Sequence, residues 1–271
     1  MLNSCKGNRC PCTLVNLQTT MSKQTIIFRD LGQMDYKTAW NYQESLLQKN
    51  VKIKSEARNQ KQEIISQGPE SFELPTVNCQ LSTVNYLLFV EHPPVYTLGK
   101  SGNMDNILLS EENLKARGID FFRTNRGGDI TFHGPQQIVG YPILDLEKFY
   151  TDIGKYLRNI EEVIILTLKE YGIEAGRSAG ETGVWIDADI KGRERKICAI
   201  GVRSSRWITM HGFALNVNTD LDYFNFIIPC GIQNKQVTSL QKELGRYVDF
   251  EEVKEKVKQN FEKVFNAELQ G

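Results

Sequence analysis

The sequence predicts an α+β fold in which a mixed β-sheet is flanked by helices. Short apolar runs typical of strands gather in the central part of the chain, between residues 83 and 217. Segments with the spacing of amphipathic helices lie before, within and after this part, and they do not alternate regularly with the strands. Regular alternation would favour a doubly wound parallel sheet, so the irregular order favours α+β.

Three segments have the apolar spacing of helices. The first begins after Asp35, a residue suited to capping, but the polar stretch from Gln48 to Thr76 predicts only a weak helix followed by a mobile loop. The second ends at Gly172, and the last begins at Asp249 with Glu252 placed as in a capping box. Their apolar faces comprise Tyr36, Ala39, Trp40 and Leu47; Leu157, Ile160, Ile164, Leu168 and Tyr171; and Val253, Val257, Phe261 and Val264.

The strand candidates are short and are bounded by Gly, Pro and charged residues. A charged stretch over 187–195, with Gly192 at its tip, reads as a hairpin loop between two of them. We expect strands over 26–28, 83–90, 95–98, 129–132, 137–144, 183–187, 196–202 and 207–217.

Length and composition indicate one globular domain of enzyme size. The chain has 271 residues, and 33 Lys and Arg residues balance 33 Asp and Glu residues. This balance gives no reason to expect binding to nucleic acid or to a membrane. No apolar run approaches the roughly 20 residues that cross a bilayer. We expect a single domain over residues 22–271, preceded by a disordered extension over residues 1–21.

The cysteines indicate a reducing compartment. Cys5, Cys10 and Cys12 lie in the N-terminal extension, which lacks the basic-then-apolar order of a signal peptide. Without a secretion signal, reduced thiols and a cytoplasmic location are the expectation. Neither a histidine nor a second cysteine pair stands at ligand spacing from Cys10 and Cys12, so we expect no metal site.

The three histidines all stand beside turn-forming residues. His92, His133 and His211 precede Pro, Gly and Gly respectively. Strand ends and loops often line clefts, so these positions favour a shared cleft, although a structural role for each is equally open. No carboxylate or thiol stands at ligand spacing from them, which argues against a metal centre.

Two further residues could carry chemistry. Cys230 lies between Pro229 and Gly231, which can present its sulfur on a turn; the alternative is a small apolar core residue. Lys196 stands where a charged hairpin tip meets an apolar strand. A lysine drawn to such a boundary loses solvation and can act as a base, but most lysines are simply solvated.

Several segments, in order and in spacing, resemble the lipoyl(octanoyl) transferases over roughly residues 80–240. Because the segments are independent and in register, the resemblance is specific. They are 91–99 (EHPPVYTLG), 126–142 (RGGDITFHGPQQIVGYP), 183–185 (GVW), 196–201 (KICAIG), 211–216 (HGFALN) and 229–232 (PCGI).

The resemblance implies a fold and a site. The fold would be the mixed-sheet domain shared with biotin and lipoate protein ligases, with a small C-terminal subdomain. Cys230 would be the nucleophile that carries the acyl group as a thioester, and Lys196 its general base. The resemblance implies neither a metal nor a cofactor. The acyl group would be bound by Arg126, Gly127, Gly128, Asp129, Ile130, Thr131, Phe132, His133, Ala199, Ile200, Gly201, Gly212, Phe213 and Ala214.

The resemblance also implies a reaction. Octanoyl-acyl carrier protein would be the donor. The acceptors would be lysines of the lipoyl domains of 2-oxoacid dehydrogenases and of the glycine cleavage H protein, and the process would be protein lipoylation. The alternatives are an ATP-dependent lipoate or biotin ligase on the same fold, a hydrolase pairing Cys230 with His211 or His133, and a carrier-protein binding module. Two departures stand out: Gln136 replaces a usual glycine, and Cys198 a usual alanine.

Overall fold

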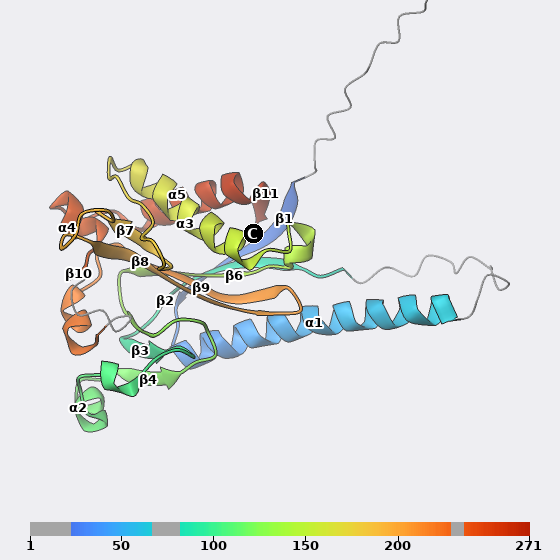
Figure 1. Cartoon of the computed structure of the whole chain (residues 1–271), viewed down its shortest axis with the longest axis horizontal. Helices are drawn as coiled ribbons and strands as arrows, with labels where there is room; N and C mark the ends of the chain where they lie inside the picture. The colour runs from blue at the N-terminus through green and yellow to red at the C-terminus, as the bar shows by residue number, and fades with distance from the viewer. Residues whose placement is uncertain (1–22, 67–81, 229–235) are drawn as a thin grey trace, which may run out of the picture.

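The computed structural model describes residues 23–66, 82–228 and 236–271, and an eight-stranded mixed sheet is its central element (Figure 1). The strand order is β10-β8-β9-β6-β2-β1-β11, and β7 also pairs with β8. The middle pairs are antiparallel, whereas β1 runs parallel to both of its neighbours. The strands are β1 (Gln24–Gln33), β2 (Asn85–Glu91), β6 (Gln137–Ile143), β7 (Val184–Ile186), β8 (Arg195–Ser205), β9 (Ile208–Asn216), β10 (Gln236–Val237) and β11 (Ala267–Gln270).

Helices cover both faces of this sheet, which confirms the predicted α+β class. Helix α1 (Tyr36–Ser66) lies along one face, and α3 (Ile153–Lys169) and α5 (Phe250–Phe265) pack on the other (Figure 1). Helix α5 begins where the sequence predicts, because the Asp249 carboxylate accepts the N–H groups of Glu251 and Glu252. Among the described helices, none has the length and apolar character to cross a bilayer.

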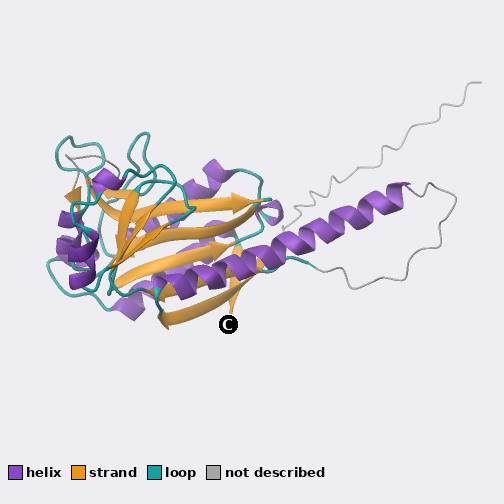
Figure 2. Ribbon diagram, turned by 90° about the horizontal axis from the view of Figure 1, so that it is seen from below, coloured by secondary structure: helices purple, strands orange, loops and turns teal. Residues whose placement is uncertain are grey.

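The helix expected after Gln48 is present up to Ser66, as part of one continuous helix, α1, whose end extends beyond the sheet (Figure 2). Its polar residues continue to make buried contacts. The Asn50 side chain exchanges two hydrogen bonds with the backbone of Val84, and Lys54 Nζ lies 2.8 Å from the Asp145 carboxylate. These partners come from residues far along the chain, so composition alone did not indicate them. Residues 67–76 of the expected loop lie outside the described ranges.

A second, three-stranded sheet packs beside the main one, in the order β4-β3-β5. It comprises β3 (Val95–Leu98), β4 (Asp120–Arg123) and β5 (Ile130–His133), with α2 (Glu111–Ala116) and the 3₁₀ helix η4 (Leu221–Phe226) alongside. Neither β4 nor α2 is among the elements predicted from the sequence. The chain passes from this sheet into β6 of the main sheet at the turn after His133, so residues of both sheets meet there.

The expected small C-terminal subdomain is integrated with the main body. The side chains of Val253, Val257 and Phe261 on α5 are fully buried in the core that α3 shares with the sheet. The last strand, β11, pairs with β1 in parallel. The C-terminal segment therefore completes one face and one edge of the main sheet.

Candidate active site

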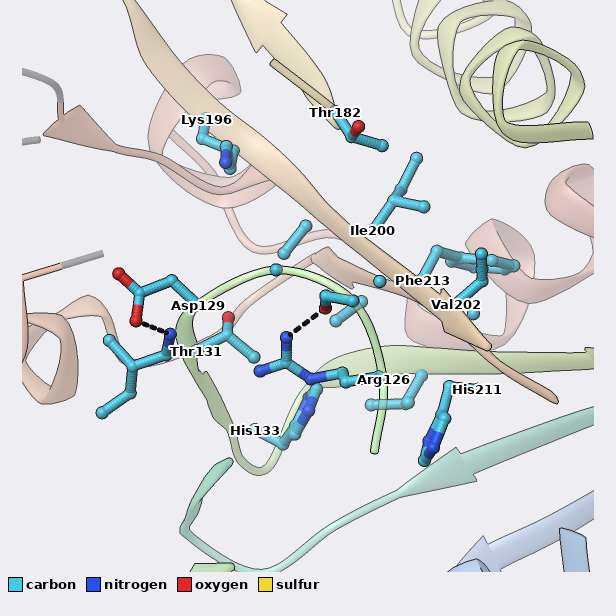
Figure 3. A pocket seen from close by; sticks show the side chains of 18 of the residues that line it. Arg126, Asp129, Thr131, His133, Thr182, Lys196, Ile200, Val202, His211 and Phe213 are labelled. Carbon is cyan, nitrogen blue, oxygen red and sulfur yellow. Dashed lines mark hydrogen bonds between the residues drawn. The ribbon is translucent and has the colours of Figure 1, made fainter. Parts of the chain in front are cut away.

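A cavity of about 600 Å³ lies where the two sheets meet, around the outer edge of β8 (Figure 3). The loop between β4 and β5 lies on one side of β8 and the N-terminal part of α3 on the other. The lining includes Lys196 and most of the residues that the sequence assigns to acyl binding. These are Arg126, Gly127, Gly128, Asp129, Ile130, Thr131, His133, Ala199, Ile200, Gly201, Gly212, Phe213 and Ala214.

Among the described residues, one predicted site residue, Phe132, is not in this lining. Phe132 points into the core of the small sheet, where its ring stacks on Tyr223 with centroids 4.6 Å apart. Strand alternation accounts for this, because the neighbouring residues Thr131 and His133 face the cavity. Cys230 lies outside the described residues.

The loop that carries Arg126 is fixed to the free edge of β8. The Gly127 N–H donates to the carbonyl of Val202 at 2.9 Å. The approach is close: a Cβ atom on Gly201 would lie 2.9 Å from the Gly127 carbonyl oxygen. Gly128 has a φ of +85°, a conformation that glycine adopts without steric cost. The glycines of this motif thus allow backbone to lie against backbone at the cavity wall.

Arg126 is buried, and its guanidinium bonds the small sheet. Nη2 donates to the carbonyl and the hydroxyl of Thr97, at 2.7 and 3.0 Å, and Nη1 donates to the Gly127 carbonyl. The Asp129 carboxylate, on the same loop, accepts from Asn106 Nδ2 at 2.6 Å. Two charged side chains therefore fix the loop: Arg126 bonds Thr97, and Asp129 bonds Asn106.

Lys196 lies near the start of β8, half-buried, with its side chain at the cavity (Figure 3). Its backbone pairs with Trp185 of β7 and Val237 of β10. The ammonium Nζ lies 4.5 Å from the centre of the Trp185 ring. A Cβ atom on Gly183 would lie 3.4 Å from Lys196 Cε, so this glycine leaves room for the lysine side chain.

A buried carboxylate on α3 supports the segment beside Lys196. Glu161 is fully buried and accepts from the N–H of Gly183 at 3.0 Å. The same carboxylate forms ion pairs with Arg158 and Arg177, at 2.9 and 3.0 Å. Because a buried charge is costly unless it is paired, this arrangement fixes the start of β7 relative to α3.

The three histidines are buried and neutral. Burial lowers the pKa of His92 to about 4 and that of His211 to about 3, and it lowers the pKa of His133 well below its usual value. His133 bonds Gln137, which in turn donates to Asn216 of β9. His133 and His211 line the cavity, whereas His92 lies behind it and bonds the hydroxyl of Tyr141.

Gln136 keeps the left-handed turn that glycine would favour. Its φ is +62°, which is strained for a residue with a side chain. Its N–H donates to Glu91, and its side-chain carbonyl accepts from Asn218 Nδ2 and from the hydroxyl of Tyr247, both at 2.8 Å. These bonds offset the strain, so the substitution leaves the turn intact.

Cys198, two residues after Lys196, does not line the cavity. Cys198 is fully buried in the core between the sheet and α3, and burial raises the pKa of its thiol. Among the described residues, no cluster of three His, Cys, Asp or Glu side chains is placed to bind a metal ion.

The structure adds lining residues that the sequence analysis missed. Gln137, Val139 and Tyr141 alternate along β6, so their period of two was a usable signal once His133 was suspected. The sequence places Tyr36 and Trp40 only on the apolar face of a helix. In the structure, Tyr36 also lines the cavity. The remaining additions are Ser101, Ile153, Leu157, Gly180, Glu181, Thr182, Val202, Asn216, Phe224 and Val237.

Comparison with solved structures supports the fold. A bipartite lipoate protein ligase from Thermoplasma acidophilum superposes with a TM-score of 0.59 at 17% identity, covering 92% of this chain and 86% of that chain. A lipoate-protein ligase A bound with ATP gives the same TM-score at 16% identity, covering 92% of this chain and 88% of that chain. At this identity the likeness concerns the fold alone.

Sequence comparison identifies the family. The model of the lipoyl protein ligase A/B catalytic domain matches residues 35–262. An octanoyltransferase from Flavobacterium johnsoniae is 58% identical over 245 residues, 90% of this chain and 98% of that protein. One from Cytophaga hutchinsonii is 46% identical, over 92% of this chain and 96% of that protein. The chain therefore belongs to the lipoyl protein ligase A/B catalytic domain family and, within it, to the octanoyltransferases.

Proposed function

We propose that this protein transfers an octanoyl group from the pantetheine thioester of an acyl carrier protein, through a thioester on Cys230, to a lysine of a lipoyl domain. The observation that carries the proposal is the position of Lys196. It is a half-buried lysine at the wall of a cavity that the acyl-binding motifs line, in a chain closely similar to octanoyltransferases.

The described residues on either side of Cys230 support its role. Ile228, two residues before it, donates its N–H to Asn106, and the Asn106 side chain bonds Asp129 of the cavity wall. After it, β10 begins at Gln236, and the Thr238 N–H donates to the carbonyl of Lys196 at 2.9 Å. One described end of the segment that contains Cys230 is thus bonded directly to Lys196 of the cavity lining, and the other is bonded to Asn106, whose side chain bonds Asp129 of the lining.

The chemistry requires one group that accepts and returns protons. Lys196 takes the proton of the Cys230 thiol, and the thiolate attacks the octanoyl carbonyl. When the tetrahedral intermediate collapses, the pantetheine sulfur leaves and receives that proton. In the second half, the acceptor lysine attacks the new thioester, loses a proton to Lys196, and Cys230 leaves as the thiol. The amide is more stable than the thioester, so no nucleotide is needed.

The negative oxygen of each tetrahedral intermediate needs a hydrogen-bond donor. The Gly127 N–H is already bonded to Val202, and Gly201 and Gly212 face each other in the β8–β9 ladder. We therefore assign this role to the Gly128 N–H, in the same loop.

Intact-mass analysis tests the proposal. The full chain, incubated with octanoyl-carrier protein and no ATP, should gain one octanoyl group and pass it to an apo lipoyl domain. Cys230→Ser should gain none, while the matched Cys198→Ser control should react normally because Cys198 lies in the core. An adduct that persists in Cys230→Ser would refute the nucleophile. Transfer that requires free octanoate and ATP would indicate the ligase alternative.

A further inference from the structure

The residues that line the cavity lie on both faces of the sheet and divide at β8 into two groups, which we call the lobe on the α1 side and the lobe on the α3 side. Strand alternation places Ala199 and Gly201 towards α1, and Ile200 and Val202 towards α3. Figure 3 shows this division, with Arg126 and His133 on one side of β8 and Thr182 and Ile200 on the side of the α3 helix. β8 pairs with β7 up to Cys198 and is next bonded on this edge at Val202, by the Gly127 N–H, so the stretch of edge between these two contacts leaves room for the two lobes to join.

The lobe on the α1 side is closed. Except for the partly exposed Ala199, its lining side chains are buried, and several of their polar atoms are bonded to one another or to His92 behind the lobe. His133 bonds Gln137, Gln137 bonds Asn216, and the Tyr141 hydroxyl bonds His92. Small residues of β8 and β9 leave the space free. The lining of this lobe includes Tyr36, His133, Gln137, Val139, Tyr141, Ala199, Gly201, His211, Gly212, Ala214 and Asn216.

The lobe on the α3 side is open and apolar. Ile153 and Leu157, four residues apart, present one face of α3 to it, and both side chains are half-buried. Ile200 and Val202 of β8 face them and are also half-buried. Gly180, at the rim, is exposed, and Thr182 adds a hydroxyl group. Ile153, Ile200 and Val202 pack against the edge of the core, and all four aliphatic side chains remain partly exposed to solvent.

The two lobes match a donor whose carbonyl carbon lies between an acyl tail and a pantetheine arm. An acyl thioester carries the octanoyl tail on one side of the carbonyl and the pantetheine arm on the other. A cavity of about 600 Å³ is in the range that holds drug-sized ligands, roughly 300–1,000 Å³, and is larger than an eight-carbon tail needs. The closed lobe suits the tail, which has no need of solvent. The arm must reach back to the carrier protein, so it needs a path to the surface.

We propose that the open lobe formed by Ile153, Leu157, Thr182, Ile200 and Val202 binds the pantetheine arm of the acyl donor. This inference rests on the proposed function. The aliphatic side chains contact the dimethyl-substituted part of the arm, and Thr182 offers its hydroxyl to the amide groups. Binding in this lobe places the thioester sulfur beside Lys196, at the junction of the two lobes.

Two donors that share the octanoyl tail but differ in the pantetheine arm distinguish arm binding from tail binding. Octanoyl transfer to a lipoyl domain is measured with octanoyl-pantetheine and with S-methyl octanethioate, which has the tail but no arm. In Leu157→Glu we expect kcat/KM to fall at least tenfold for octanoyl-pantetheine and to stay within twofold for the methyl thioester. Ala214→Val, in the closed lobe, should lower kcat/KM for both donors. Ile190→Glu is the matched control, because Ile190 is exposed and outside the cavity.

The outcomes are distinguishable. Equal losses with both donors in Leu157→Glu would mean that the open lobe holds the tail, and no loss with either would mean that it holds no part of the donor; each result overturns the proposal. Ile153→Gln repeats the test if circular dichroism shows that Leu157→Glu does not fold. Failure of the unaltered protein to transfer octanoyl from any thioester would instead refute the proposed function itself.

Discussion

The ammonium of Lys196 lies over the face of the Trp185 ring, with Nζ 4.5 Å from its centroid. The two residues are also paired across β7 and β8, so backbone and side chain fix the same geometry. The indole face attracts a cation and is almost completely buried. The ring therefore orients the lysine towards the cavity without itself lining it.

Replacement of Trp185 tests this orientation. A cation–π contact is worth about 0.5–2 kcal/mol, so we expect Trp185→Leu to lower kcat for octanoyl transfer by roughly two- to thirtyfold. Trp185→Phe keeps an aromatic face and should recover most of the rate. Thermal unfolding of both variants separates a loss of stability from a loss of rate. Equal rates in the Leu and Phe variants would contradict the role of the ring.

Two substitutions of Lys196 distinguish its electrostatic attraction of the Cys230 thiolate from its role in proton transfer. Lys196→Arg keeps the positive charge but does not release a proton at working pH. We expect it to keep part of the reactivity of Cys230 towards an alkylating reagent and to lose most octanoyl transfer, whereas Lys196→Ala should lose both. If either variant only raises KM for the carrier protein, with turnover at saturation unchanged, Lys196 serves docking rather than catalysis.

The turn at Gln136 predicts different stabilities for two small substitutions. Gln136→Ala loses the side-chain bonds to Asn218 and Tyr247 but keeps a Cβ atom at a φ of +62°. Gln136→Gly loses the same bonds and relieves the backbone strain. We expect the glycine variant to be the more stable of the two by about 1 kcal/mol, measured by urea unfolding. An alanine variant of equal or greater stability would show that the backbone is unstrained.

The buried histidines predict a loss of stability in acid. Below about pH 6.5 the unfolded chain binds protons that the native chain does not, so the free energy of unfolding falls as pH falls. Because the pKa of native His92 is about 4, this residue alone accounts for about 3 kcal/mol of the loss between pH 6.5 and 4.

His92→Asn provides the measurement. Asparagine keeps a donor for the Met34 carbonyl but does not titrate, and it loses the bond to Tyr141. The variant should be less stable at pH 7.5, and its unfolding free energy should depend less steeply on pH between 6.5 and 4. His133 and His211 remain, so some dependence persists. An unchanged slope would mean that native His92 is protonated in this range.

The core and its strands were largely readable from the sequence, because their signals are local. Alternation and turn residues gave β3 with its observed bounds and gave β5, β6, β7, β8 and β9 to within a few residues. The Asp249 cap is also a local signal, since it involves residues two and three positions apart. For the second half of α1 the sequence predicts only a weak helix, because Asn50 and Lys54 are buried only through partners at 84 and 145.

Residue types and their spacing along the chain were enough to predict the α+β class, the motif residues and the family. Which motif residues share a cavity depends on the tertiary structure. It turned Phe132 into the small sheet's core, brought Tyr36 and Tyr141 to the wall, and placed Lys196 on Trp185. It also divided the cavity into two lobes at β8. Strand pairing and burial bring together residues that are distant in the sequence, so local sequence patterns do not predict these contacts.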